Sequence, residues 1–186
     1  MFVTGTSGNG KTTLATALAE LLRVPYTELD ALHHGPDWTE ASAEELGERV
    51  EAAMAASDGW VLDGSYETKL GDLAWERSDT VVWLDQPLHL ILRRLWWRTL
   101  RRIRTNEELW NGNRESWRGA FWGRESLFAW TVRSHRRRRR EWPARMERFP
   151  VVRLRTPREV RAFLDGVAGS GTPPPKPAPA DPARSA

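Results

Sequence analysis

Short apolar runs alternate with amphipathic stretches along most of the chain. The apolar runs are residues 1–4, 25–29, 60–62, 81–84 and 151–154. Each is bounded by turn or charged residues, which predicts a strand. The stretches that repeat apolar residues at helical spacing are 11–22, 42–56, 88–103 and 157–167. Strands alternating with helices predict a parallel sheet covered on both faces, with ligands beyond the carboxyl ends of its strands.

Two of the predicted helices have recognisable starts. Ser42 is followed three residues later by Glu45, the spacing of a capping box, and Pro157 occupies the first turn of the last helix. Residues 105–142 are rich in Arg and Trp, and four of their apolar residues are spaced four, seven and four apart: Trp117, Phe121, Phe128 and Val132. This spacing places the four residues on one face of a helix.

Length and composition predict one domain followed by a tail. The chain has 186 residues, of which 40% are apolar, enough for a single core. We expect that domain to span residues 1–168. From residue 169 to 186 the composition turns to Pro, Ala, Gly and Ser, and we expect this tail to be disordered. The first run is short for a buried central strand, which leaves a native start upstream of Met1 open.

The composition also limits the cellular compartment and the kinds of partner that we expect for this protein. The chain contains no cysteine, which excludes disulfides and thiolate zinc sites. It shows neither a signal-like segment nor an apolar stretch of about 20 residues, so we expect a cytoplasmic protein without a membrane partner. The net charge is +3, with three lysines and the rest of the positive charge from arginine. Arginine suits phosphate recognition, although codon usage would explain the same bias.

The strongest chemical signal is the segment from Gly5 to Thr12. It fits the P-loop pattern G-x-x-x-x-G-K-[ST] between a predicted strand and a predicted helix. The Lys11 ammonium would reach the β- and γ-phosphates of ATP, or alternatively GTP, and the Thr12 hydroxyl would hold Mg²⁺. The residues expected to bind the nucleotide are Gly5, Thr6, Ser7, Gly8, Asn9, Gly10, Lys11, Thr12 and Thr13.

Two carboxylates follow neighbouring apolar runs. Asp63 ends the run 60–62, where a Walker B carboxylate would meet magnesium, directly or through water. Asp30 ends the run 25–29 and would face the acceptor, orienting its hydroxyl or accepting its proton. For both residues a plain turn is the alternative. His33 and His34 lack metal-like spacing, so they serve either substrate contact or turn polarity.

Arginines are concentrated in the second half of the chain. Arg94, Arg98, Arg101 and Arg102 share one face of the predicted helix 88–103. That face is either solvated or, together with Arg114, Arg118 or Arg124, part of a mobile lid that neutralises charge on the transferred phosphoryl group. The run 136–140 is all arginine. It would either bind a nucleic-acid backbone or form the solvated end of a helix.

These segments resemble one group of P-loop proteins. The P-loop, Glu28-Leu29-Asp30, Leu62-Asp63-Gly64 and the spacing Arg94-x-x-x-Arg98 look like the small kinases of the adenylate-kinase-like group. Residues 29–34 and 109–115 are particularly similar to bacterial proteins described as adenylate kinase or as kinases related to a DNA topology modulation protein. The resemblance covers about residues 1–165.

The resemblance implies a fold and assigns a function to several segments and residues. It implies an α/β P-loop NTPase sandwich of three layers, with a five-stranded parallel sheet in the order 2-3-1-4-5. An acceptor-binding segment would span about residues 30–57 and an Arg/Trp-rich helical lid about residues 105–142, with 156–160 near the base. The catalytic residues would be Lys11, Asp30, Asp63, Arg98 and Arg114. In adenylate kinases Phe-Pro-Arg follows the Asp-Gly pair, whereas Ser65-Tyr66-Glu67 follows it here, which argues against a nucleoside monophosphate acceptor.

The sequence therefore predicts a phosphotransferase that moves the γ-phosphoryl group of MgATP to a small acceptor under a basic lid that excludes water. The acceptor would be a nucleotide or another small hydroxyl or phosphate compound. The first alternative is a nucleic-acid-associated P-loop ATPase or regulator that uses the Arg/Trp segment. Acidic residues interspersed through that segment weigh against it. The second alternative is a nucleotide-binding module without turnover. The oligomeric state and the acceptor stay open.

Overall fold

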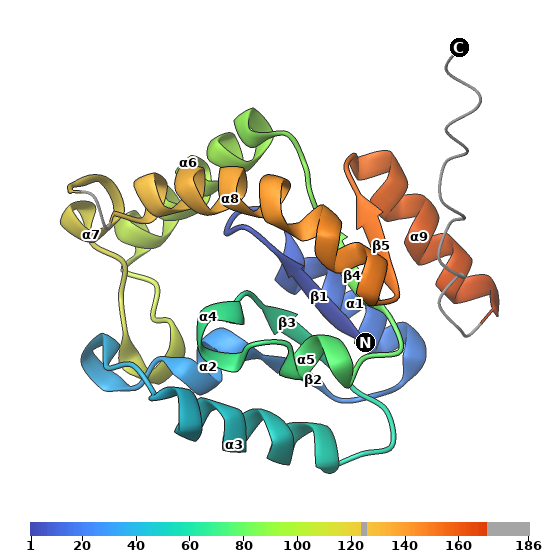
Figure 1. Ribbon diagram of the computed structural model, residues 1–186. Coiled ribbons are helices and arrows are strands. Elements are labelled where there is room, and N and C mark those ends of the chain that lie inside the picture. The colour runs from blue at the N-terminus through green and yellow to red at the C-terminus, as the bar shows by residue number, and fades with distance from the viewer. Residues whose placement is uncertain (124–125, 171–186) are drawn as a thin grey trace.

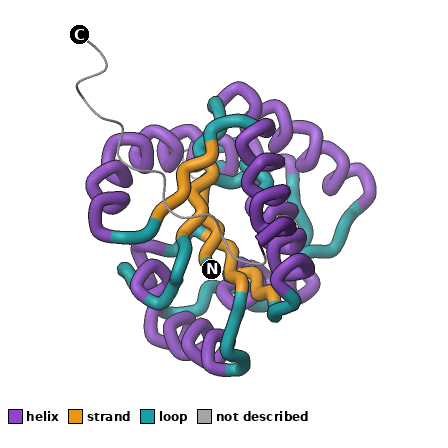
Figure 2. Tube along the Cα trace, turned by 90° about the vertical axis from the view of Figure 1, so that its right-hand side faces the viewer, coloured by secondary structure: helices purple, strands orange, loops and turns teal. Residues whose placement is uncertain are grey.

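A five-stranded parallel sheet forms the centre of the protein. The computed structural model describes residues 1–123 and 126–170. The strands are β1 (Phe2–Gly5), β2 (Tyr26–Glu28), β3 (Val61–Gly64), β4 (Val81–Leu84) and β5 (Val151–Leu154). They pair in the order β2-β3-β1-β4-β5, which confirms the predicted fold class and strand order. Figure 2 shows the strands in the middle of the molecule with helices on both sides.

The strands β1, β3, β4 and β5 contribute to both cores because successive side chains point to opposite faces of the sheet. On one face Val3, Val82 and Val152 pack with helices α1 and α9. On the other face Phe2, Val81 and Val151 pack with α3, α5 and the carboxyl-terminal half of α8. The helices that cover the sheet are α1 (Lys11–Leu22), α3 (Ala43–Ala55), α5 (Leu73–Glu76), α8 (Leu127–Arg148) and α9 (Pro157–Ser170).

The remaining helices surround the carboxyl ends of the strands. They are α2 (Leu29–His33), the 3-10 turn η1 (Pro36–Trp38), α4 (Glu67–Leu70), α6 (Leu88–Thr105), the 3-10 turn η2 (Trp110–Gly112) and α7 (Trp117–Phe121). In Figure 1 the chain leaves α6, descends to the region of α2 and then returns to α7. The side chain of Asn113 then bonds the backbone of Gly35 and Trp38, so this connection is tied to the segment after β2.

Several predicted elements are confirmed, and two of them, the strand β2 and the helix α9, have bounds that differ from the prediction. The capping box of Ser42 and Glu45 starts α3 as expected. The run 25–29 yields a shorter strand because Leu29 already begins α2. Helix α9 continues to Ser170, two residues into the stretch expected to be a tail, and residues 171–186 of that tail lie outside the described residues.

The single helix face proposed within residues 105–142 is wrong. Trp117 and Phe121 belong to α7, whereas Phe128 and Val132 belong to α8. The aromatic rings nevertheless meet, because α7 folds back on α8: the centroids of Trp117 and Phe121 are 5.5 Å apart and those of Phe121 and Phe128 are 4.8 Å apart. Spacing thus predicted the contact of these rings but assigned it to the wrong element.

No helix within residues 1–123 and 126–170 has the length and apolar character needed to span a bilayer.

Candidate active site

The P-loop leaves β1 through backbone that only glycine accommodates. Gly5 has a φ of 146°, and a Cβ there would lie 2.6 Å from the Leu84 carbonyl oxygen. Gly8 has a φ of 81°, and a Cβ there would lie 2.9 Å from the Ile91 carbonyl oxygen on α6. The Asn9 side-chain amide donates to the Leu84 carbonyl at 2.8 Å. The loop is therefore anchored to both β4 and α6.

Most of the predicted nucleotide-binding residues border one large cavity. This cavity has a volume of about 1350 Å³, and its P-loop lining comprises Ser7, Gly8, Gly10, Lys11, Thr12 and Thr13. Thr6 and Asn9 are buried beneath it, each 2% exposed. Lys11 begins helix α1, so its backbone N–H lies at the helix N-terminus, where anions are favoured.

Three side chains whose oxygen atoms can bind a metal ion lie near Lys11: those of Thr12, Glu28 and Asp63. The Thr12 hydroxyl donates to a Glu28 carboxylate oxygen at 3.3 Å. Asp63 is 1% exposed and accepts a hydrogen bond of 3.2 Å from the Tyr26 hydroxyl. Burial raises the pKa of Asp63 to about 6, while the nearby Lys11 ammonium opposes the shift. Thr12, Glu28 and Asp63 suit Mg²⁺, which takes oxygen ligands and usually one or two carboxylates beside phosphates.

Glu28 is the residue that our reasoning about function missed. Its second carboxylate oxygen accepts a hydrogen bond of 2.8 Å from the Trp110 indole N–H. The sequence did contain a signal for Glu28. It lies at the end of β2, two residues before Asp30, and both residues therefore lie at the same edge of the sheet. Among the residues that the structure describes, no group of three or more His, Asp or Glu forms a metal site by itself.

The ionisation of Asp63 affects the free energy of unfolding of the protein. Its folded pKa of about 6 lies above the value of about 3.9 expected in an unfolded chain. The folded state therefore binds more protons between these values, and stability falls as pH rises through that window. We expect Asp63→Asn to stabilise the nucleotide-free, magnesium-free protein by roughly 2–3 kcal/mol at pH 7 and by little below about pH 4. Urea unfolding at both pH values measures this.

The matched control is Asp58→Asn, the same change at an exposed position, which should leave the free energy of unfolding nearly unchanged. A destabilised Asp63→Asn protein at pH 7 would contradict the prediction.

Asp30 borders the same cavity. Its carboxylate accepts a hydrogen bond of 2.6 Å from the Tyr66 hydroxyl, which lies 3.3 Å from Nε2 of His34. Burial and the neighbouring Asp30 raise the pKa of Tyr66. Tyr66 thus stays a neutral donor. His33 and His34 also line the cavity, and burial lowers the pKa of His33.

Arginines from α6 and the following loop line part of the cavity, and we call them the roof arginines. The lining includes Arg94, Arg98, Arg101, Arg102 and Arg114. Glu115 receives the Arg102 guanidinium at 2.9 Å and the Arg98 guanidinium at 3.9 Å. Burial lowers the pKa of Arg98, and its buried Nε has no hydrogen-bond partner among the described residues. The face of α6 that carries these residues is therefore turned to the cavity. Arg118 is absent from the lining, and Arg124 lies outside the described residues.

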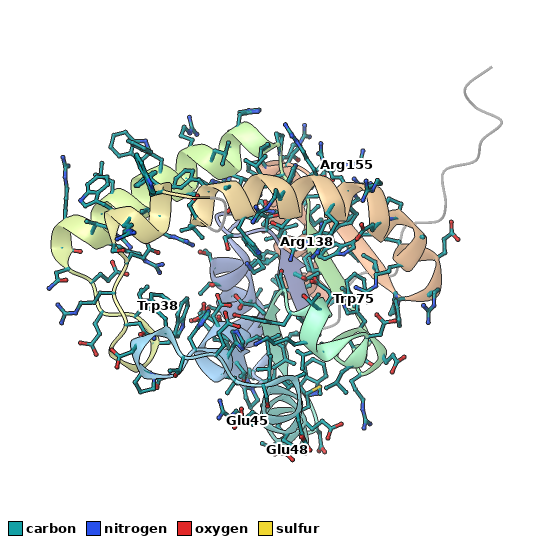
Figure 3. The ribbon with its side chains drawn as sticks, turned by 60° about the vertical axis from the view of Figure 1, so that its left-hand side comes forward. Trp38, Glu45, Glu48, Trp75, Arg138 and Arg155 are labelled. Carbon is teal, nitrogen blue, oxygen red and sulfur yellow. The ribbon has the colours of Figure 1, made fainter. Side chains whose placement is uncertain are left out.

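The five-arginine run does not end its helix, although all of its residues except Arg138 are exposed. Residues 136–140 lie in the interior of α8, where Arg138 is 2% exposed and lies 3.5 Å from both the Ser65 carbonyl and the Glu67 carboxylate. Figure 3 shows Arg138 on the side of α8 that faces the strands. Arg139 donates to the buried Asp85 at 2.7 Å, and Arg153 binds the other oxygen of that carboxylate. Two of the five arginines and Asp85 therefore serve internal ion pairs.

Two solved structures that resemble this chain are kinases. The chain aligns with shikimate kinase from Bacteroides thetaiotaomicron at a TM-score of 0.53 and 16% identity, covering 90% of this chain and 95% of that one. It aligns with a gluconokinase from Sinorhizobium meliloti 1021 at a TM-score of 0.51 and 20% identity, covering 90% and 92%. The chain has the P-loop kinase fold. The strand order and the P-loop therefore belong to one architecture, in which the site lies at the carboxyl ends of the strands.

Sequence comparison covers a smaller part of the chain. Residues 1–86 match the family model "ATPase family associated with various cellular activities (AAA)". No curated protein matches the chain significantly. The matched region ends before α6, so it includes the P-loop, Asp30 and Asp63 but none of the roof arginines. The narrower likeness to the adenylate-kinase-like group stays a prediction.

Proposed function

We propose that the protein is a phosphotransferase that moves the γ-phosphoryl group of MgATP to a small acceptor. One observation carries this proposal: the P-loop, Asp30 and the roof arginines all border the same cavity of about 1350 Å³. Nucleotide phosphates at the P-loop and an acceptor at Asp30 would thus share one space, as direct transfer requires. GTP remains the alternative donor.

The binding end of the site would hold the triphosphate. The P-loop backbone and the N-terminus of α1 would bind the phosphates, and Lys11 would pair with the β- and γ-phosphate oxygens. Thr12 and Asp63, with Glu28 beside them, would hold magnesium. Bound magnesium supplies charge neutralisation between the β- and γ-phosphates. Residues 156–160, which follow β5, are our candidates for the base.

The acceptor end would activate a hydroxyl group. Asp30 would orient that hydroxyl and accept its proton as the new phosphorus–oxygen bond forms and the β,γ-bridging bond breaks. Arg98 and Arg114 would neutralise charge on the transferred group. Residues 105–142 would act as a lid, and residues 30–57 would hold the acceptor. Excluding water prevents hydrolysis of ATP in place of transfer.

The nucleic-acid-associated ATPase has less support. Its strongest sequence feature was the arginine run 136–140, and Arg138 and Arg139 of that run bind Glu67 and Asp85 inside the protein. A backbone-binding surface needs cations that are free to neutralise phosphates. We therefore keep this alternative as an outcome of the test below.

The test is turnover of MgATP with a panel of acceptors. Purified protein is incubated with nucleosides, nucleoside monophosphates, sugars, aromatic alcohols or small hydroxy acids, and separately with single-stranded or duplex DNA. We expect ADP together with one phosphorylated small product. ADP release stimulated by DNA alone would favour the ATPase, and tight nucleotide binding without ADP release would favour the non-catalytic module.

A further inference from the structure

Three aromatic side chains form a wall beside Asp30. We call His34, Trp38 and Trp110 the aromatic wall; all three line the cavity. The His34 and Trp110 rings are stacked with centroids 5.9 Å apart, and the Trp38 ring stands edge-on to both, at 5.3 Å from His34 and 6.5 Å from Trp110. Trp38 is 40% exposed, so its ring is not needed to fill the core. Figure 3 shows Trp38 beside the loop that precedes α7.

The backbone conformation of Trp38 is energetically unfavourable for a bulky residue. Trp38 has a φ of 57°, a conformation that bulky residues rarely adopt. Asn113, which is 4% exposed, stabilises it by accepting the Trp38 backbone N–H at 2.7 Å and donating to the Gly35 carbonyl at 2.8 Å. A strained residue fixed by a buried side chain, with its ring left partly open to a cavity, indicates a binding role.

The aromatic wall and the candidate base are connected. The Tyr66 hydroxyl joins them, because it donates to Asp30 at 2.6 Å and lies 3.3 Å from the His34 ring nitrogen. One small molecule can therefore lay a ring against the wall and direct a hydroxyl group to Asp30.

The cations near the acceptor end already have carboxylate partners. Lys69 binds Glu40 at 3.0 Å. Arg114 lies 3.6 Å from Glu108, and Arg98 and Arg102 share Glu115. Arg101 lies 3.3 Å from Glu107.

Arg94 is the exception among the cavity arginines, since its partner is the neutral Gln86. It lies one turn after Ile91, where α6 contacts the P-loop, and so belongs to the nucleotide end. An acceptor phosphate would instead face Asp30 and Glu40.

Building on the kinase function proposed above, we infer that the acceptor is an uncharged alcohol that carries a planar ring and no phosphate. Nucleosides and simple aromatic alcohols share this chemistry. The ring stacks on the aromatic wall, the hydroxyl group donates its hydrogen bond to Asp30, and the lack of acceptor charge matches the paired cations around it.

The first experiment compares acceptors that differ in one feature. Product formation from MgATP is measured with four nucleosides, with their 5′-monophosphates, with aromatic alcohols and with ring-free polyols. We expect kcat/KM for a nucleoside or an aromatic alcohol to exceed that for the matched monophosphate and for polyols by at least about tenfold. The two ring-bearing arms identify which source is used. A preference for the monophosphates or the polyols overturns the inference.

The second experiment tests the wall itself. Trp38→Ala should raise KM for the ring-bearing acceptor about tenfold, the usual effect of losing one stacking partner, and leave KM for ATP nearly unchanged. Trp38→Phe should restore most of the affinity, which loss of folding would not allow. The control is Trp97→Ala, which removes a tryptophan that is 63% exposed, is not part of this cavity's lining and lies outside the lid segment. An acceptor KM that is unchanged in Trp38→Ala overturns the stacking role.

These outcomes separate the inference from the proposed function. Lys11-dependent transfer to a phosphorylated or ring-free acceptor preserves the kinase and overturns the acceptor class. Absence of Lys11-dependent transfer to every acceptor overturns both.

Discussion

Lys11→Ala is expected to reduce phosphoryl transfer by about 100- to 1000-fold, the usual loss when one cation is removed from a transition state that carries developing charge. Lys11 is the cation of the P-loop, starts α1 and lines the cavity beside Thr12. Its ammonium would contact the β- and γ-phosphates, whose charge shifts during transfer. The measurement is the steady-state rate of product formation at saturating MgATP, with nucleotide affinity determined separately.

The control for this variant is Glu20→Ala, which changes an exposed residue on the same helix and should retain full activity. Lys11→Ala protein with near-normal affinity for nucleotide and near-normal turnover would refute the phosphate site, and with it all three functions considered for the chain.

Asp30→Asn is expected to lower kcat by about 100- to 10,000-fold, the range that general base catalysis contributes. The amide keeps the shape of the carboxylate and can still accept a hydrogen bond from the Tyr66 hydroxyl, but it cannot take a proton from the acceptor. KM for ATP should change little, because Asp30 lies outside the P-loop and its carboxylate is bonded to Tyr66. Initial rates measured over a matrix of ATP and acceptor concentrations separate these effects.

Two variants define what the Asp30 result means. Asp37→Asn makes the same chemical change in the same segment at a residue outside the cavity lining, and its φ of 55° suits asparagine, so activity should be retained. Tyr66→Phe removes the hydrogen bond that orients Asp30 and should cost less than Asp30→Asn. An Asp30→Asn enzyme with unchanged kcat would remove Asp30 from the chemistry.

Local signals in the sequence were sufficient to place the P-loop between β1 and α1. The glycines at 5, 8 and 10 all adopt positive φ, and Lys11 and Thr12 follow at the start of the helix, as the motif requires. The capping box at Ser42 was equally predictable, since a cap involves residues three positions apart. Periodicity located the strands for the same reason: burial on both faces of a parallel sheet produces short apolar runs.

The acceptor end depended on residues that lie far apart in the chain. Trp110 binds Glu28 across 82 positions, and Asn113 binds Gly35 across 78. Each of these residues has an ordinary local sequence, so no periodicity or motif indicated its partner. The role of Glu28 was missed for this reason, although its place at a strand end was available.

The arginines illustrate the same limit. Arg139 pairs with Asp85, 54 positions away, and Arg138 is buried against Glu67. In sequence, a run of five arginines indicates exposure, because burying a charge without a partner is costly. The tertiary structure supplies carboxylates to Arg138 and Arg139, so Arg138 is buried and Arg139 reaches the buried Asp85 from an exposed position, while the arginines of α6 line the cavity.

The sequence by itself determined the five strands, the helices α1, α3, α6 and α9, and the glycine-rich loop between β1 and α1. These features follow from backbone conformation and from burial patterns within a few residues. Tertiary structure decided which carboxylates and arginines share the cavity, that α7 and α8 are separate helices and that an aromatic wall borders Asp30. Those features depend on charge pairing and ring packing between distant segments, and only the folded chain brings these partners together.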